Sequence, residues 1–308
     1  MSDGYDALLR GAAWLDLSAR GRTLVRGRDR ARLLHNISSN EIKKLAPGNG
    51  CYAFLLNAQG RIQADLTLLC FDDRFLIDVE PELREKVPQH IRRYIVADQV
   101  ELEDVTDQTA AIGLEGPGAA AVLASLNVPV PGADYAHVPW GENTVAAVSL
   151  TGQPGFRIYC AAARKDEIAG HLAAAGAKPA TADEARVVRL EIGKPRYGED
   201  IRDTTLPQET GQMHAISFTK GCYIGQEIVE RIRSLGHVNK QLARVEADAA
   251  EALAPGTKLT AESGDAGEIT SSVWSPRFSK VIALAFVRAP FAESGKALQA
   301  GDIEVRVA

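Results

Sequence analysis

The stretch Lys220-Gly221-Cys222-Tyr223-Ile224-Gly225-Gln226-Glu227 is the most informative part of this 308-residue chain. Glycines on both sides of the cysteine describe a loop in which the backbone can approach other groups closely. Apolar residues then follow at helical spacing, namely Ile228, Val229, Ile232 and Leu235. The pattern therefore predicts a loop that leads into the N-terminus of a helix. A cysteine in such a loop, next to Lys220, lies in a setting that favours the reactive thiolate form.

The composition limits the classes of function. Hydrophobic residues make up 45% of the chain and charged residues 24%, which is typical of a globular protein with two or three structural units. Lys and Arg number 35 against 40 Asp and Glu, a net charge of −5 that disfavours a nucleic-acid partner but permits a local basic pocket. No apolar run approaches the ~20 residues that span a bilayer, and the N-terminal residues show no signal or transit pattern. We therefore expect a cytoplasmic protein without a membrane partner.

The four cysteines are Cys51, Cys70, Cys160 and Cys222, and they lie far apart with no CxxC pair. This spacing argues against a local zinc or iron–sulfur ligand set, and a reducing compartment argues against disulfides. We therefore predict no resident metal. Cys70 and Cys160 end apolar runs and are expected to be buried, whereas Cys222 is flanked by glycine and close to lysine.

Hydrophobic periodicity predicts an α+β fold in the first two thirds of the chain. We expect helices at 28–40, from Pro81 to about Tyr94 with a kink or break at Pro88, through about Leu126, and at 164–175. Strands are expected at 62–70, 75–79, 99–105, 109–115, 145–150 and 155–160. Because hairpin, helix and strand content occurs twice, the sequence predicts two α+β lobes of ferredoxin-like character, with a linker at 128–141.

The last third begins with a clear helix start. Thr181 and Glu184 form a capping box, and the helix should stop at Gly193 or before Pro195. From about residue 240, short alternating strands separated by Gly-rich turns predict a small β-barrel. The expected domains are residues 1–239, which form two intertwined lobes, and residues 240–308, which form the barrel.

Four ordered motifs carry a family resemblance. They are Asn57–Leu66, Arg189–Asp200, the barrel residues Gly267–Ala285, and the Lys220–Glu227 loop, which is the most specific of the four. Together they resemble the YgfZ family of folate-binding proteins, which are implicated in iron–sulfur cluster maintenance and related to the glycine-cleavage T-protein. The resemblance implies two ferredoxin-like or Greek-key lobes and a C-terminal β-barrel, arranged as in the T-protein around a central hole. It also implies tetrahydrofolate or a folate derivative as cofactor, and iron–sulfur enzymes or assembly factors as partners.

The resemblance assigns roles to five residues. Asp65 would face the N5–N10 region of the folate as general base or electrostatic stabiliser, and Glu191 would accept hydrogen bonds from the pterin. Tyr52 would stack on or beside the pterin, and Lys220 would attract the folate tail or activate Cys222. The cysteine itself would be a nucleophile, a redox-sensitive thiol or a transient metal ligand. The alternative interpretations from the pattern are an exposed strand acid for Asp65, a solvated helix acid for Glu191, a half-buried core residue for Tyr52, a surface lysine for Lys220 and a packed loop cysteine for Cys222.

Departures from the T-protein pattern bear on the reaction. T-proteins usually carry acids around the turn where this chain has Gln153 and Arg157, and they have an arginine in place of Gln226 and no cysteine in place of Cys222. These differences disfavour aminomethyl transfer. The sequence thus predicts a tetrahydrofolate-binding protein that supports assembly or repair of iron–sulfur enzymes, with a functional loop cysteine. A folate-dependent aminomethyltransferase of glycine-cleavage type is the alternative, and a folate-binding module whose cysteine senses oxidation is a third; transferase-like activity stays open.

Overall fold

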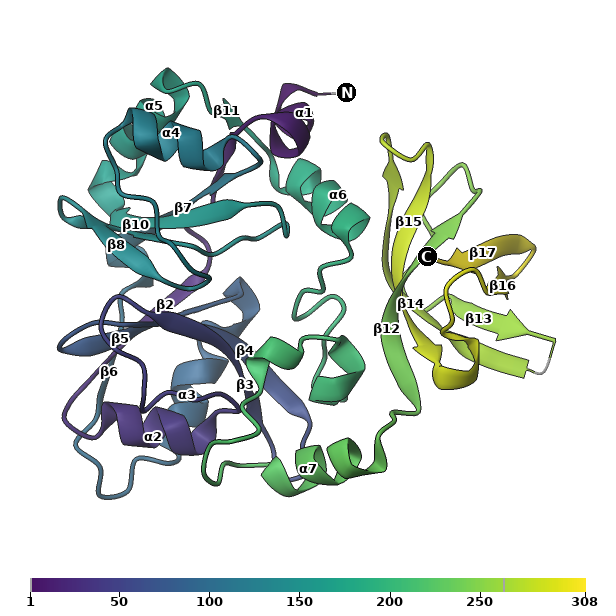
Figure 1. Ribbon diagram of the computed structural model, residues 1–308, viewed down its shortest axis with the longest axis horizontal. Helices are drawn as coiled ribbons and strands as arrows, with labels where there is room; N and C mark the ends of the chain where they lie inside the picture. The colour runs from purple at the N-terminus through teal and green to yellow at the C-terminus, as the bar shows by residue number, and fades with distance from the viewer. Residues whose placement is uncertain (1, 263) are drawn as a thin grey trace.

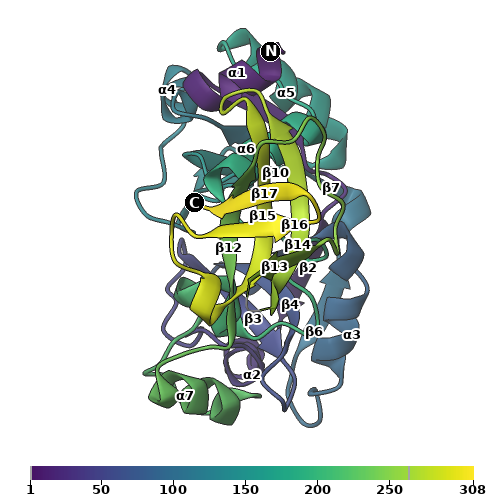
Figure 2. The same ribbon diagram turned by 90° about the vertical axis from the view of Figure 1, so that its right-hand side faces the viewer.

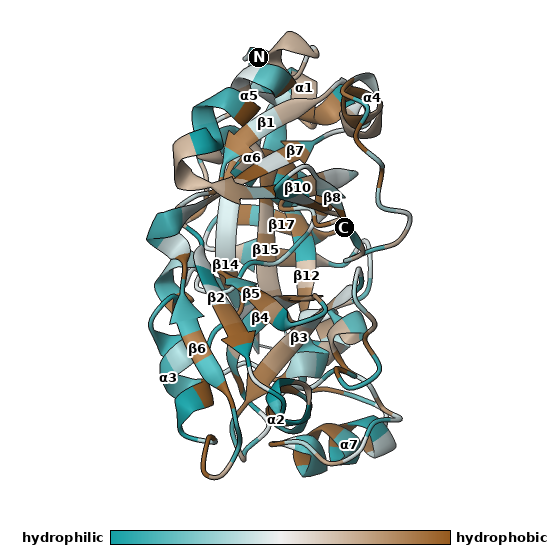
Figure 3. Ribbon diagram, turned by 90° about the vertical axis from the view of Figure 1, so that its left-hand side faces the viewer, coloured by the Kyte–Doolittle hydropathy of each residue, from teal (hydrophilic) through white to brown (hydrophobic). Residues whose placement is uncertain are grey.

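The predicted strand at 62–70 lies between two other strands of the first lobe. The computed structural model, which describes residues 2–262 and 264–308, places it in a five-stranded sheet of order β3-β4-β5-β2-β6 (Figure 1). The strands are β2 (Gly21–Arg26), β3 (Gly50–Leu56), β4 (Ile62–Cys70), β5 (Arg74–Val79) and β6 (Glu101–Asp104). Helices α2 (Arg30–Ile37) and α3 (Lys86–Arg92) complete the lobe. In Figure 3 the strands of this lobe carry hydrophobic stretches, whereas α3 is mostly polar.

One predicted helix of this lobe differs from the structure. The segment from Pro81 forms a short 3-10 turn, Pro81–Leu83, and α3 begins only at Lys86. The break precedes Pro88, which lies in the first turn of α3. Because the first N–H groups of a helix have no intrahelical partner, a proline there costs little, so Pro88 fits in the first turn of α3 and does not kink a longer helix.

The second lobe contains a six-stranded sheet of order β11-β1-β7-β10-β9-β8. Its strands are β1 (Ala13–Asp16), β7 (Thr109–Glu115), β8 (His137–Trp140), β9 (Asn143–Ala146), β10 (Gly155–Ala161) and β11 (Lys178–Pro179), with helices α1 (Asp3–Arg10), α4 (Ala119–Ser125) and α5 (Lys165–Ala174). The chain starts in this lobe with α1 and β1, builds the first lobe, and then returns. Part of the predicted linker forms β8, because residues 137–140 pair with β9 at the edge of the sheet.

A long connector joins the lobes to the barrel. Helix α6 (Ala182–Ile192) begins with the predicted Thr181–Glu184 capping box and ends at Gly193, whose φ of 87° is left-handed. Two 3-10 turns follow at Pro207–Thr210 and Met213–Ala215, and then α7 (Gln226–Leu235). Figure 1 shows this connector running between the stacked lobes and the barrel.

The C-terminal unit is a closed barrel of order β12-β15-β14-β13-β16-β17. Its strands are β12 (Lys240–Ala247), β13 (Lys258–Ala261), β14 (Gly264–Ser275), β15 (Lys280–Arg288), β16 (Ala297–Ala300) and β17 (Ile303–Val307). Figure 2 shows the barrel lying across both lobes. The predicted α+β class with two lobes and a β-barrel is therefore confirmed. Within the described residues, no helix has the length and apolar character needed to cross a membrane.

Candidate ligand cavity between the two lobes

A cavity of about 540 Å³ lies where the two lobes meet the connector. The first lobe contributes Arg20, Tyr52, Asp65, Thr67 and Glu80; the second contributes residues 134–135, 147–150, 152–155 and Arg157; the connector contributes Arg189, 192–196, Gln212 and His214. None of the described barrel residues lines it. The barrel, which we expected to help surround the ligand, instead contacts the connector, through α6 and the 3-10 turn Pro207–Thr210.

Asp65 and Tyr52 come together on neighbouring strands β4 and β3. The Tyr52 hydroxyl donates a hydrogen bond of 2.9 Å to Oδ2 of Asp65, while the buried Oδ1 has no partner. Burial, followed by the negative charge of Glu80, raises the pKa of Asp65 to about 6. A carboxylate with one free oxygen, poised to gain or lose a proton near neutral pH, can accept a hydrogen bond from a ligand or exchange a proton with it.

Three rings gather beside this carboxylate. The Tyr52 ring lies 5.4 Å from His214 and 6.5 Å from Tyr135, with interplanar angles of 25° and 15°. Tyr135 and His214 are 6.4 Å apart at 19°, and the Tyr135 hydroxyl lies 3.3 Å from Nε2 of His214. Tyr135 has a φ of 62°, which is rare for a residue with a side chain and often marks a functional site. The nearly parallel rings suit a flat heterocyclic ligand.

Sequence reasoning did not find two of these rings. His214 belongs to no metal-ligand spacing or periodic pattern in the sequence, but it lies in the 3-10 turn at Met213–Ala215 and lines the cavity. Tyr135 falls within the predicted linker, where no periodic pattern singles it out.

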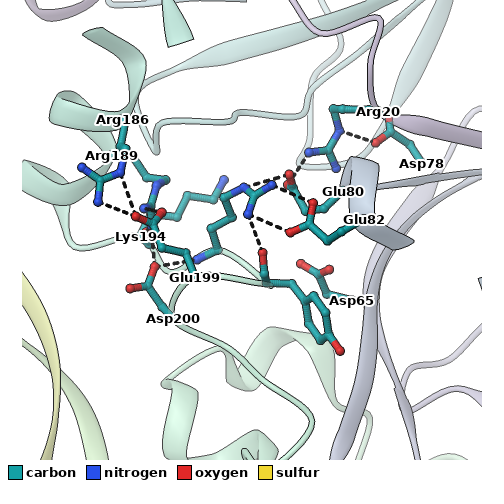
Figure 4. Close-up of polar contacts among 12 residues, drawn as sticks. Arg20, Asp65, Asp78, Glu80, Glu82, Arg186, Arg189, Lys194, Glu199 and Asp200 are labelled. Atoms are coloured by element: carbon teal, nitrogen blue, oxygen red, sulfur yellow. Dashed lines mark hydrogen bonds and ion pairs between the residues drawn. The ribbon is translucent and has the colours of Figure 1, made fainter. Parts of the chain in front are cut away.

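A buried ion-pair network forms another part of the wall. Asp78 accepts hydrogen bonds from Arg20 (2.6 Å), Arg157 (2.9 Å) and the Tyr159 hydroxyl (2.9 Å), and Arg20 also pairs with Glu80. Burial opposes ionisation of Asp78, but the two arginines outweigh it and hold its pKa below the usual range. Arg196, which also pairs with Glu80, leads to the connector side, where Arg186 and Arg189 pair with Glu199 and Arg189 pairs with Asp200 (Figure 4).

The turn after β9 closes the cavity on the side of the second lobe. The expected strand at 145–150 ends at Ala146, because the buried Glu115 carboxylate binds the next segment instead of leaving it in the sheet. Glu115 accepts hydrogen bonds from the backbone N–H groups of Leu150 and Thr151 and from the hydroxyls of Ser149 and Thr151. Lys194 holds the turn from the other side, since its Nζ donates to the carbonyl of Ser149.

Glu191 and Lys220 lie outside this cavity. The Glu191 carboxylate is buried against the barrel and α1, where Oε1 accepts hydrogen bonds from Tyr5 and Ser275. Lys220 is buried below the end of α2, and its Nζ donates to the carbonyls of His35, Ser38 (2.6 Å) and Asn40 (2.9 Å). Burial lowers the pKa of Lys220 to about 8. The hydrogen bonds of both side chains are therefore made within the protein, although the buried Oε2 of Glu191 has no hydrogen-bond partner.

Cys222 lies at a separate depression of about 500 Å³, which is lined by His35, Asn36, Lys43 and residues 221–224. It is exposed, whereas Cys51, Cys70 and Cys160 are buried. The cysteine precedes α7 by several residues, because the N-cap of that helix is Gly225. The structure thus brings Tyr52 and Asp65 together in one cavity and places Cys222 at another.

Two regions of the chain match known protein domains. Residues 2–220 match the GCVT N-terminal domain, and residues 240–308 match the glycine cleavage T-protein C-terminal barrel domain. The aminomethyltransferase of Rubrobacter xylanophilus is 29% identical over 294 residues, which cover 92% of this chain and 78% of that protein. The aminomethyltransferase of Geobacillus kaustophilus is 28% identical over 312 residues, which cover 97% and 85%.

A solved structure supports the same fold. The glycine cleavage system aminomethyltransferase T from Bartonella henselae superposes with a TM-score of 0.87 over 99% of this chain and 87% of its own, at 20% identity. The predicted T-protein-like arrangement of lobes and barrel is thereby confirmed. Since the two domain matches together cover most of its length, the chain belongs to the glycine-cleavage T-protein family.

Proposed function

We propose that this chain binds a tetrahydrofolate-type ligand in the cavity between its lobes. The observation that carries the proposal is the pairing of Asp65 with three nearly parallel rings, those of Tyr52, Tyr135 and His214. A pterin is flat and carries N–H groups, so it can lie against such rings and donate to a carboxylate. The unpartnered, buried Oδ1 of Asp65 supplies an acceptor that this ligand would satisfy.

In this proposal only some of the expected residues contact the ligand. Tyr52 and Asp65 bind it and, when the folate carries a one-carbon unit, Asp65 holds or moves a proton beside it. Glu191 holds α6 against Tyr5 and Ser275 through Oε1. Its buried Oε2 has no hydrogen-bond partner, but the side chain does not line the cavity, so the proposed pterin contact is with Asp65.

We further propose that the protein supports assembly or repair of iron–sulfur enzymes through the Cys222 loop. The support is the resemblance of residues 220–227 to the YgfZ family, together with the exposure of this thiol alone among the four cysteines. One thiolate cannot hold a cluster, so the proposed role is transient and requires ligands from a partner protein or a small thiol. Lys220 contributes by fixing the loop to the carbonyls at the end of α2.

Calorimetry with tetrahydrofolate tests the ligand. We expect micromolar affinity, about −8 kcal/mol, and a loss of about 10-fold or more for Asp65→Ala, because a charge-assisted hydrogen bond is removed. Asp107→Ala is a suitable control, since this exposed acid lies outside the cavity. Absence of folate binding by the unaltered protein would reject the proposal.

Aminomethyl transfer is the second candidate, because the relatives from Rubrobacter xylanophilus and Geobacillus kaustophilus are aminomethyltransferases. We expect no appreciable release of ammonia and methylene-tetrahydrofolate from an aminomethylated lipoyl protein, because Gln153 and Arg157 line the cavity. Steady turnover at about 1 s⁻¹ or faster would favour the transferase instead. A complementation experiment distinguishes the preferred function from aminomethyl transfer and from oxidation sensing. Expression of this protein in cells that lack it should restore the activities of iron–sulfur enzymes.

A further inference from the structure

One part of the cavity wall carries positive charge that the protein does not neutralise. We propose that Lys194 and Arg157 form an anion subsite, which binds a carboxylate group beside the folate-type ligand; this rests on the function proposed above. The carboxylate belongs either to the glutamate tail of the folate or to a separate small carboxylic acid bound with it. The shared chemistry is a carboxylate against an ammonium and a guanidinium group.

Lys194 is the first element of the subsite. It lies just after α6 at the wall of the cavity, and its Nζ donates to the Ser149 carbonyl. Among the described residues, no carboxylate lies within 4.0 Å of this ammonium group. An ammonium has three N–H donors, so a single carbonyl leaves capacity for an anionic acceptor.

Arg157 is the second element. Its side chain is only 3% exposed and lines the same cavity. Nη1 donates to Asp78, but the buried Nε has no hydrogen-bond partner. A buried N–H without an acceptor is unfavourable, and an anion at this wall would relieve that cost directly or through a water molecule.

The charge balance of the lining residues agrees with these contacts. The cations are Arg20, Arg157, Arg189, Lys194 and Arg196, and the carboxylates are Asp65, Glu80 and Asp134. Arg20 and Arg196 share Glu80, and Arg189 pairs with acids of the connector. Arg157 pairs with Asp78, so Lys194 is the one lining cation that has no carboxylate partner among the described residues, and its charge favours an anionic ligand over an amine.

The subsite has an expected pH dependence. Burial lowers the pKa of Lys194 to about 8, so the ammonium form is lost as the pH rises through that value. The charged or titratable groups that act on it from the neighbouring elements are Glu115 (β7), Arg157 (β10), Arg20, Glu80 and His214. Glu115 and Glu80 favour the charged form, whereas the two arginines oppose it. Carboxylate-dependent affinity should therefore fall between about pH 7 and pH 9.

Titrations with three ligands test the proposal. The ligands are 6-methyltetrahydropterin, which lacks a carboxylate, tetrahydrofolate, and glutarate, which is titrated both alone and in the presence of the pterin. The main variant is Lys194→Gln. Within the described residues, the ammonium group that it removes donates a hydrogen bond to the Ser149 carbonyl. Arg157→Lys is the second variant, since it keeps the charge that Asp78 requires. Lys178→Gln, on the exposed strand β11, is the control with the same change of net charge.

If the tail is the source, tetrahydrofolate should bind at least 10-fold tighter than the pterin. Lys194→Gln should reduce that ratio at least fivefold and remove its pH dependence. If a separate acid supplies the carboxylate, 6-methyltetrahydropterin and tetrahydrofolate should bind with the same affinity, and Lys194→Gln should abolish glutarate binding. The proposal is overturned if Lys194→Gln and Arg157→Lys change neither the ratio nor glutarate binding. The protein could also bind glutarate but neither the pterin nor tetrahydrofolate. If Lys194→Gln then abolishes glutarate binding, the proposed folate function is rejected and the anion subsite is retained.

Discussion

Asp65 is held in a state that suits ligand binding better than stability. Its pKa is raised from 3.8 to about 6 by burial and by Glu80, so the folded protein binds this proton more tightly than the unfolded chain does. The ionised carboxylate therefore destabilises the fold above about pH 6, and the cost declines as the pH falls from there towards 3.8. A buried acid with an unpartnered oxygen is thus a functional candidate in its own right.

We predict that Asp65→Asn raises the free energy of unfolding at pH 8 by up to about 3 kcal/mol, at 1.36 kcal/mol for each pKa unit. The side chain keeps its shape, and its carbonyl oxygen can still accept the Tyr52 hydroxyl hydrogen bond. Denaturant unfolding at pH 8 and pH 4 measures the effect, which should largely disappear at pH 4. An asparagine variant that is less stable than the unaltered protein at pH 8 would contradict the raised pKa.

Cys222 differs from the other cysteines in its surroundings. Burial raises the pKa of Cys51 to about 12 and also raises that of Cys70 and Cys160, which suppresses their thiolates. We predict that alkylation at neutral pH, followed by mass spectrometry, modifies Cys222 first. Cys222→Ser should leave the fold intact, because the side chain is exposed, yet impair iron–sulfur enzyme activity in cells. Full complementation by Cys222→Ser, with no preferential alkylation of Cys222 in the unaltered protein, would reduce Cys222 to a packing residue.

At the scale of elements, the turn between β9 and β10 depends on one acid. Glu115 at the end of β7 is fully buried, and its two oxygens accept from the backbone and hydroxyl donors of residues 149–151. We predict that Glu115→Gln lowers the free energy of unfolding by about 2–4 kcal/mol. In this variant an amide NH₂ group, which is a donor, replaces one carboxylate oxygen and faces the N–H and O–H donors of the turn. Hydrogen exchange of residues 149–153 should speed up, and folate affinity should fall with it.

Glu268→Gln on the exposed surface of the barrel is the matched control for Glu115. It should change the free energy of unfolding by less than about 1 kcal/mol, because exposed ion pairs contribute little. Equal exchange rates in the turn for Glu115→Gln and Glu268→Gln would show that Glu115 does not organise it.

The elements that were predicted well are those that local sequence specifies. The alternating residues 62–70 and the Thr181–Glu184 capping box gave β4 and the start of α6 as the structure has them. The predicted strand at 145–150 was too long because Glu115, distant in sequence, captures the backbone after Ala146. A local pattern does not contain that tertiary interaction.

At the scale of the whole molecule, the cavity could be predicted only in part. The motif resemblance pointed to Asp65, and Tyr52 was a candidate for stacking on the ligand. The two residues lie on adjacent strands, where Tyr52 pairs with Thr67 and its hydroxyl reaches Asp65 diagonally. Tyr135, His214 and Lys194 come from the second lobe and the connector, and only the packing of these units brings them to the same cavity. The same packing turns Glu191 towards the barrel, a direction that its helical spacing alone does not specify.

The barrel is fixed to the lobes through the connector, and Asp200 is central to this contact. One of its oxygens accepts from Arg189 (2.7 Å) and the other from the hydroxyls of Thr270 (2.7 Å) and Ser271 on β14. Asp200 is fully buried, and its partner Arg189 lines the cavity. The carboxylate thus links the position of the barrel to the cavity wall.

We predict that Asp200→Asn lowers the free energy of unfolding by about 3 kcal/mol, since it leaves the buried Arg189 with one carboxylate fewer. The barrel should also separate more readily from the lobes, so limited proteolysis at residues 236–239, before β12, should be faster. Asp265→Asn is the matched control, because its exposed ion pair with Arg288 lies within the barrel. It should cost less than about 1 kcal/mol and leave the cleavage rate unchanged. If both variants are cleaved at the same rate, the barrel is held by its apolar contacts and not by Asp200.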